Sequence, residues 1–154
     1  MKFDIRNATA ADSEVIATFN SRMCQETEGR PLNPAIIGAG VSALLKDSTK
    51  GRYWVAESAG EVIGQIMVTY EWSDWRNGTI WWIQSVYVHP EHRRRGIFSA
   101  LYRHVESLAN DNNACGLRLY VEDSNERAQK TYQSLGMMNP NYQVMETIFG
   151  DTKC

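Results

Sequence analysis

The sequence predicts a single α/β domain with a mixed central sheet and helices on both of its faces, and three observations lead to this prediction. The chain has 154 residues, enough for one domain with its own hydrophobic core. Stretches with the two-residue alternation of strands and stretches with helical spacing follow one another in the order β-α-α-β-β-β-α-β-α-β. No Pro- and Gly-rich linker separates them, so we expect residues 1–154 to form one domain.

The chain begins with a predicted strand over residues 2–8, where apolar and polar residues alternate. Thr9 or Asp12 then offers a side-chain oxygen that can cap a helix running to about Cys24. The polar stretch over residues 25–31 contains a glycine and a proline, which favour a loop. We therefore expect the first helix to end before this stretch.

The later elements are predicted from apolar spacing and from the turn residues between them. In chain order they are a helix over 34–46, strands over 53–57, 62–72 and 79–88, a helix over 97–110, a strand over 117–121, a helix from Ser124 or Asn125 to about Leu135, and a strand within 142–149. Asn77-Gly78 is a strong signal for a tight hairpin turn, and Gly136 is a typical helix stop.

Composition excludes several classes of protein. A formal charge of −2 and an isoelectric point near 5.9 argue against a coat for nucleic acid or for an anionic membrane. Neither a signal-peptide core nor an apolar stretch of membrane-spanning length is visible, and we expect a cytoplasmic protein. Cys24, Cys115 and Cys154 are an odd, scattered set that indicates reduced thiols. The histidines lack nearby partners at ligand spacing, so no metal site is expected.

A basic turn between a strand and a helix is the first candidate binding site. The strand ends at Pro90, three arginines follow over residues 93–95, and a helix begins near Gly96. Unpaired N–H groups and the positive end of the helix dipole bind phosphate, and a glycine allows the anion to approach closely. Two other interpretations are a solvated basic loop and a nucleic-acid patch, although further clustered basic residues would be expected for the second.

A second segment pairs an amide with a phenol. Asn125 and Tyr132 are seven residues apart, two turns of one helix, so they lie on the same face with Ala128 between them. A small residue flanked by these groups suits a narrow ligand channel. Taken alone, the pattern equally describes a capping asparagine and a core tyrosine.

Together these segments resemble the GNAT superfamily of N-acetyltransferases. Arg93-Arg94-Arg95-Gly96-Ile97-Phe98 is similar to the family's Gln/Arg-x-x-Gly-x-Gly/Ala motif, with Phe98 in place of the usual Gly or Ala. The segment from Asn125 through Ala128 and Tyr132 to Leu135-Gly136-Met137 is similar to the family's next helix. The two motifs cover roughly residues 80–137 and stand in the family's order.

The resemblance implies acetyl-CoA as co-substrate and direct transfer of its acetyl group to a primary amine within a ternary complex. Tyr132 matches the residue that protonates or hydrogen-bonds the departing sulfur, and Glu71 or Glu122 is a candidate base, because Gln84 stands where many relatives have a glutamate. The residues implied to bind coenzyme A are Val86, Tyr87, Val88, Arg93, Arg94, Arg95, Gly96, Ile97, Phe98, Ser99, Asn125 and Tyr132.

The acceptor groove is expected to favour a cationic amine with an aromatic wall. Its candidate residues are Glu26, Glu28, Trp72, Trp75 and Gln84. We expect the acceptor to be a small molecule or a protein amine, and the chain to be a monomer or a homodimer. Two other functions stay open: a catalytically silent coenzyme-A-binding regulatory or interaction module, and a generic nucleotide-binding protein, which the absence of a Gly-x-Gly-x-x-Gly pattern disfavours.

Overall fold

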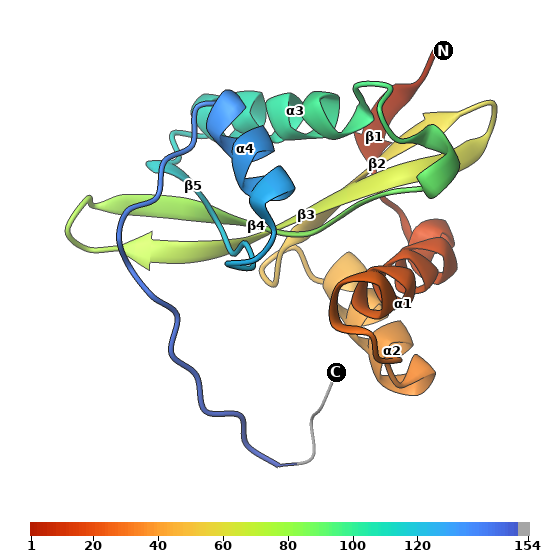
Figure 1. The fold of residues 1–154 in the computed structure, drawn as a ribbon, viewed down its shortest axis with the longest axis horizontal. Helices are drawn as coiled ribbons and strands as arrows, with labels where there is room; N and C mark the ends of the chain where they lie inside the picture. Colours follow the sequence, from red (N-terminus) through yellow and green to blue (C-terminus); the bar gives the residue numbers. More distant parts are fainter. Residues whose placement is uncertain (151–154) are drawn as a thin grey trace.

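The computed structural model describes residues 1–150, and Figure 1 shows its five-stranded sheet between two pairs of helices. The elements are β1 (Asp4–Asn7), a 3₁₀ turn (Ala10–Asp12), α1 (Ser13–Glu28), α2 (Pro34–Lys46), β2 (Arg52–Ser58), β3 (Glu61–Ser73), β4 (Gly78–Val88), a 3₁₀ turn (Pro90–His92), α3 (Ile97–Asp111), β5 (Gly116–Leu119) and α4 (Glu126–Ser134). The strands lie in chain order, antiparallel from β1 to β4, and β5 is parallel to β4. The mixed sheet with helices on both faces is therefore confirmed.

The two helix pairs cover opposite faces of the sheet, with α3 and α4 on one side and α1 and α2 on the other (Figure 1). The larger core forms under α3, where Ile97, Leu101 and Val105 repeat at helical spacing and pack against β2, β3 and β4. A smaller core around Ile16 and Val41 forms beneath α1 and α2. Burial of these apolar side chains is the main force that holds both layers on the sheet.

Neighbouring tryptophans on β4 face opposite sides of the sheet, as strand geometry requires. Trp81 is buried in the larger core and stacks on Trp54, with 6.3 Å between ring centroids. Trp82 points to the other face, where its ring lies 4.6 Å from that of Tyr120.

Helix α1 is longer than predicted, because residues 25–28 continue it and the expected loop over 25–31 is wrong for them. Glutamine and glutamate are good helix formers, so nothing in the stretch breaks the helix before Gly29. Gly29 ends it with φ 67°, and its N–H donates to the carbonyl of Gln25 at 3.1 Å. This extension places Glu26 and Glu28 on a helix.

The strand predicted within 142–149 is also wrong for the described residues. Residues 137–150 form no helix or strand, and in Figure 1 this segment leaves α4 and runs away from the sheet. Strand β5 ends at Leu119, two residues before the predicted end. Sequence pattern predicts that a segment favours an extended conformation, but a strand also needs a partner.

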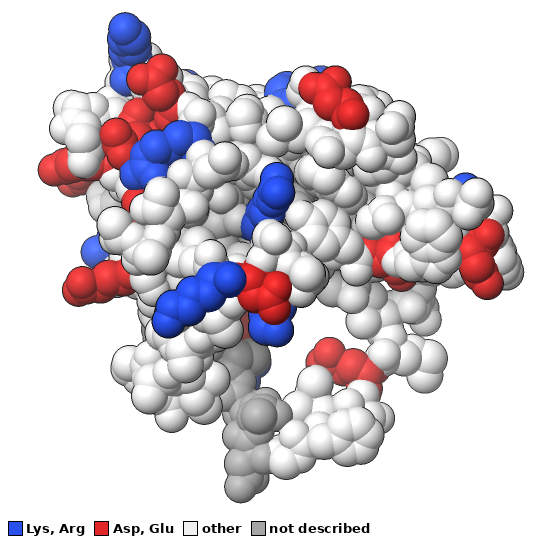
Figure 2. Space-filling view, turned by 180° about the vertical axis from the view of Figure 1, so that it is seen from behind, with Lys and Arg blue, Asp and Glu red and all other residues white. Residues whose placement is uncertain are grey.

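Charged side chains of both signs are interspersed on the face shown in Figure 2. Among residues 1–150, no helix combines the length and the apolar character needed to cross a lipid bilayer. Cys24 is buried in α1 and Cys115 is exposed just before β5, whereas Cys154 lies outside the described residues.

Candidate active site

The site begins where β4 and β5 separate. Their parallel pairing covers only Ile80–Ile83 and Gly116–Leu119, while β4 continues to Val88. On its other edge β4 is irregular: Ser85 has φ 51°, and the pairing with β3 shifts register between Gln65 and Met67. A bulge of this kind bends a strand and leaves backbone groups without ladder partners. The edge of β4 from Gln84 to Val88 therefore faces an opening between the two strands.

A buried polar network holds the bulge from behind. Gln65 is 0% exposed, and its Nε2 donates to the carbonyl of Ser85 at 3.0 Å and to Oδ1 of Asn20 at 3.0 Å. Asn20 in turn donates to the hydroxyl of Tyr53 at 3.0 Å. Burial raises the pKa of Tyr53, although its hydrogen bonds with Asn20 and Ser85 oppose this. The network joins α1, β2 and β3 to the one irregular point of β4, and sequence inspection missed it.

The N-terminus of α3 lies at the end of β4 and is open to a ligand. Gly96 is its N-cap with φ 78°, no side chain of the described residues caps it, and a Cβ atom on Gly96 would meet nothing within 4 Å. The N–H groups of the first helical turn, from Ile97 to Ser99, have no intrahelical partner. Gly64 allows α3 to pack this closely, because a Cβ there would lie 3.2 Å from Cγ2 of Ile97. The turn thus presents donors to an anion without an obstructing side chain.

Three of the predicted residues, Glu26, Tyr87 and Arg93, bind one another beside the turn. Arg93 forms an ion pair with Glu26 at 2.8 Å and donates from Nε to the carbonyl of Val88 at 2.9 Å. The hydroxyl of Tyr87 donates to the same carboxylate at 2.8 Å, and Arg93 lies over the Tyr87 ring at 5.2 Å. Burial disfavours the charged carboxylate, but Tyr87 and Arg93 outweigh it, so the pKa of Glu26 is lowered.

Arg94 and Arg95 remain exposed at the turn itself. Arg94 has φ 63°, an unusual backbone conformation for a residue with a side chain, directly before the helix. Both guanidinium groups raise the positive potential beside the open N–H groups of α3.

Tyr132 lies across the opening on α4, against Phe98 of α3. Their ring centroids are 5.4 Å apart, so the bulky residue in the first turn of α3 packs against the phenol. Phe98 also packs partly on the larger core. Burial raises the pKa of Tyr132 to about 12, so this phenol keeps its proton at neutral pH.

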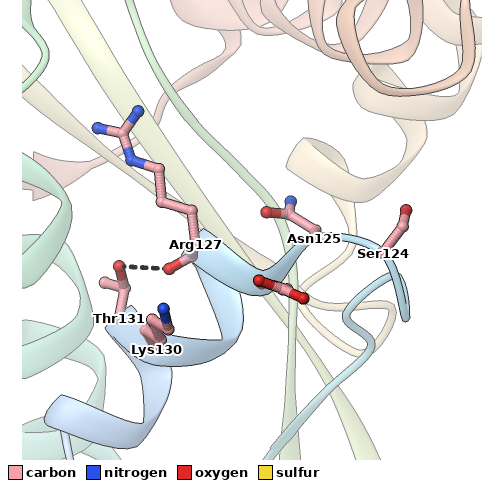
Figure 3. A pocket seen from close by; sticks show the side chains of 6 residues that line it. Ser124, Asn125, Arg127, Lys130 and Thr131 are labelled. Atoms are coloured by element: carbon pink, nitrogen blue, oxygen red, sulfur yellow. Dashed lines mark hydrogen bonds between the residues drawn. The ribbon is translucent and has the colours of Figure 1, made fainter.

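Asn125 caps α4 by accepting the N–H of Ala128 on Oδ1 at 3.1 Å. Beside it a groove of about 590 Å³ runs along the start of the helix, lined by Ser124, Asn125, Glu126, Arg127, Lys130 and Thr131 (Figure 3). Arg127 and Lys130 project from successive turns and give this groove two cations. Sequence analysis missed both, although basic residues three apart on one helix were a usable signal.

The remaining candidates are spread over the sheet. Glu71 forms an ion pair with Arg118 of β5 at 2.7 Å, and Gln84 donates to the hydroxyl of Thr69 at 2.6 Å. Met67 packs in the core under α1 and α2, so strand alternation places Thr69 and Glu71 on that same face. Trp72 lies on the opposite face of β3 from Glu71.

Three candidates lie on other elements. Trp75 occupies the β3–β4 connection and is 90% exposed. Glu28 binds Arg30 at 3.0 Å, and Glu122 is exposed in the loop before α4, where it accepts from Ser124. The structure therefore places Glu71 and Gln84 on one face of the sheet, Glu28 at the end of α1, and Trp75 and Glu122 in connections between elements. Among residues 1–150, no three His, Cys, Asp or Glu side chains lie together in a way that could hold a metal ion.

Comparison with known proteins identifies relatives of this chain. The chain is 36% identical to thialysine N-epsilon-acetyltransferase from Bos taurus over 75 residues, which are 49% of this chain and 44% of that protein. It is 33% identical to the enzyme of that name from Sus scrofa over 87 residues, 53% of this chain and 51% of that protein. The chain thus spans about half the length of the curated relatives it matches.

Solved structures share the whole fold. A possible acetyltransferase from Clostridium difficile 630 has a TM-score of 0.90 at 45% identity, covering 97% of this chain and 99% of that one. A predicted acetyltransferase with acetyl-CoA from Clostridium acetobutylicum has a TM-score of 0.79 at 16% identity, covering 95% and 96%, which shows the fold alone. The family model of the acetyltransferase (GNAT) family matches residues 16–137. The chain belongs to the acetyltransferase (GNAT) family.

Proposed function

We propose that the chain is an acetyl-CoA-dependent N-acetyltransferase that passes an acetyl group to a primary amine by direct attack in a ternary complex. The observation that carries this proposal is the opening between β4 and β5, with the uncapped start of α3 at one end and Tyr132 across it. Acyl transfer needs an anion cradle, free backbone donors and a group near the leaving sulfur, and these three features supply them.

Coenzyme A fits the open turn because Gly96 leaves space and no side chain of the described residues caps the helix. The N–H groups of residues 94–99 hold its diphosphate, with Arg94 and Arg95 adding charge. The edge of β4 from Val86 to Val88 contacts the extended arm of the coenzyme. In this proposal Arg93 supports the turn through Glu26 and Val88 and does not bind phosphate directly.

Tyr132 donates a hydrogen bond to the departing sulfur. A pKa of about 12 means that the phenol is protonated throughout the physiological range. A thiol has a pKa of about 8.5, so full proton transfer from this phenol to a thiolate is unfavourable. Asn125 orients the coenzyme arm through its Nδ2 while Oδ1 caps α4.

The acceptor amine approaches over the face that carries Glu71, Gln84 and Trp82. Alkyl amines have a pKa of about 10, so the attacking nitrogen must lose a proton. Glu71 attracts the cationic amine and takes its proton, directly or through water, and Glu122 is the other candidate base. The acceptor is a small molecule or a protein amine, and the relatives named thialysine N-epsilon-acetyltransferase favour a small amine at the end of an alkyl chain. A reducing cytoplasm suits the exposed thiol of Cys115.

A second candidate function is a catalytically silent coenzyme-A-binding module. Two departures favour it: Gln84 cannot take a proton, and Phe98 fills space beside Tyr132. Retention of both Tyr132 and the open turn favours the enzyme.

One experiment separates the two functions. Purified protein is given acetyl-CoA and a panel of primary amines that includes thialysine, lysine, polyamines and a lysine peptide, and free thiol is measured over time. Amine-dependent release above acetyl-CoA hydrolysis, with acetylated product seen by mass spectrometry, supports the enzyme. Calorimetric binding of coenzyme A with no release for any amine supports the silent module. Absence of binding contradicts both.

A further inference from the structure

Arg118 of β5 lies on the sheet face over which the acceptor is proposed to approach. Its neighbours Leu117 and Leu119 pack on the larger core, so strand alternation directs Arg118 to the opposite face. In the register of the sheet Arg118 is opposite Trp82 of β4. Nη1 of Arg118 donates to Oε2 of Glu71 on β3 at 2.7 Å, and 33% of the Arg118 side chain is exposed. The guanidinium group therefore crosses β4 and remains open to solvent.

Arg118 has hydrogen-bond donors that the protein does not use. Among residues 1–150 it binds one carboxylate, through Nη1, and its Nε and Nη2 have no acceptor. A guanidinium group carries five N–H donors, enough for two carboxylates at once. Arg6 of the same molecule binds two, Asp12 at 2.8 Å and Glu57 at 2.6 Å, with 38% of its side chain exposed. Arg118 has similar exposure and can therefore bind a second carboxylate.

An aromatic pair lies beside Arg118 on the side of the opening between β4 and β5. The ring of Trp82 lies 4.6 Å from that of Tyr120, which is 60% exposed. Trp82 comes three residues before Ser85, the bulged residue at the opening, which is about 10 Å at the rise of a strand. Aromatic rings bind alkyl chains and ammonium groups. An alkyl chain on these two rings can therefore connect the opening to Arg118.

We propose that Arg118 binds the carboxylate of the acceptor, and that the acceptor is an amino acid whose reacting amine is separated from its carboxylate by an alkyl chain. The amine lies at the opening beside Ser85, and the chain lies on Trp82 and Tyr120. Glu71 fixes Arg118 from a position on β3 further from the opening, so the proton of the amine reaches Glu71 through water. This inference rests on the proposed function and adds the acceptor class to it.

The first test measures binding and needs no turnover. Protein saturated with coenzyme A is titrated in a calorimeter with lysine, with 6-aminohexanoate and with cadaverine, an alkyl diamine that has no carboxylate. We expect the two carboxylates to bind at least about tenfold more tightly than cadaverine, and Arg118→Gln to remove this difference. Arg103→Gln is the matched control, because Arg103 forms another partly exposed ion pair with a glutamate at 2.7 Å. Failure of the carboxylates to bind, equal binding of cadaverine, or a preference that survives Arg118→Gln overturns the proposal.

The second test separates this inference from the proposed function. With acetyl-CoA, Arg118→Gln should raise KM for lysine and 6-aminohexanoate at least about tenfold, and leave kcat and the KM for cadaverine nearly unchanged. Arg118→Lys keeps the positive charge and should restore part of the loss. Equal kcat/KM for cadaverine and lysine contradicts the acceptor class and leaves the acetyltransferase intact. Carboxylate binding that depends on Arg118, without turnover of any amine, supports the Arg118 site and contradicts the proposed activity.

Discussion

Replacing Tyr132 with phenylalanine tests the chemistry of the site most directly. The hydroxyl of Tyr132 has a pKa of about 12, about 3.5 units above that of a thiol, so complete proton transfer to the thiolate is uphill by about 5 kcal/mol. A hydrogen bond to a charged acceptor stabilises by about 1.5–3 kcal/mol. Tyr132→Phe should therefore lower kcat by about 10- to 150-fold and leave the affinity for coenzyme A nearly unchanged.

The assay combines thiol release, for kcat, with calorimetry, for coenzyme affinity. Tyr102→Phe is the matched control, since Tyr102 is a buried tyrosine of α3 whose loss perturbs the same neighbourhood without removing the proposed donor. Because Tyr132 stays protonated well above neutral pH, its removal should lower the rate by the same factor from pH 7 to about pH 10. An unchanged kcat, or a kcat loss matched by an equal loss of affinity, would refute the role.

Three further predictions concern binding and support. Gly96→Val should weaken coenzyme A binding at least about tenfold in calorimetry, whereas Gly136→Val, which is also at positive φ with open space, should lower only the melting temperature. Arg127 lines the cationic groove beside Asn125, which is proposed to orient the coenzyme arm, so Arg127→Ala should weaken coenzyme A binding several-fold and reduce its salt dependence. Arg103→Ala, which removes an exposed arginine paired with a glutamate, should have neither effect. Gln65→Leu leaves buried polar partners unsatisfied at about 1–3 kcal/mol, so both thermal stability and kcat should fall, and an unchanged melting temperature would contradict the network.

The sheet and most helices were predictable because their signals are local. Asn77-Gly78 marks the hairpin between β3 and β4, and apolar spacing marks α3 almost to its observed end. The last turn of α1 was missed because a polar stretch was taken for a loop, although only Gly29 stops the helix. The strand predicted within residues 142–149 was wrong for another reason: a strand needs a partner to pair with, and the sequence of this segment does not specify one.

The candidate site divides in the same way. Gly96 lies in a short motif at the start of α3, and Asn125 and Tyr132 lie in a short motif on α4. Because each motif belongs to a single helix, its place in the site could be predicted from the sequence. The pairing of Arg93 with Glu26 joins residues that are 67 positions apart, and no local pattern reports it. Only the folded structure shows that Arg93 contacts Glu26, whereas the sequence motif alone assigns Arg93 to phosphate.

Helix α1 connects these observations, since it supports the irregular end of β4 at two points. Asn20 engages the Gln65 network behind the bulge, and Glu26 binds Tyr87 and Arg93 at the end of the strand. A bulged strand is costly to maintain unless its displaced groups find partners, and these side chains provide them from the face opposite α3. The backbone donors of β4 are thus held before any ligand arrives, which is the condition for stabilising charge that develops during acyl transfer. We therefore expect changes on α1 to alter coenzyme A binding from the face of the sheet that carries Glu71 and Gln84.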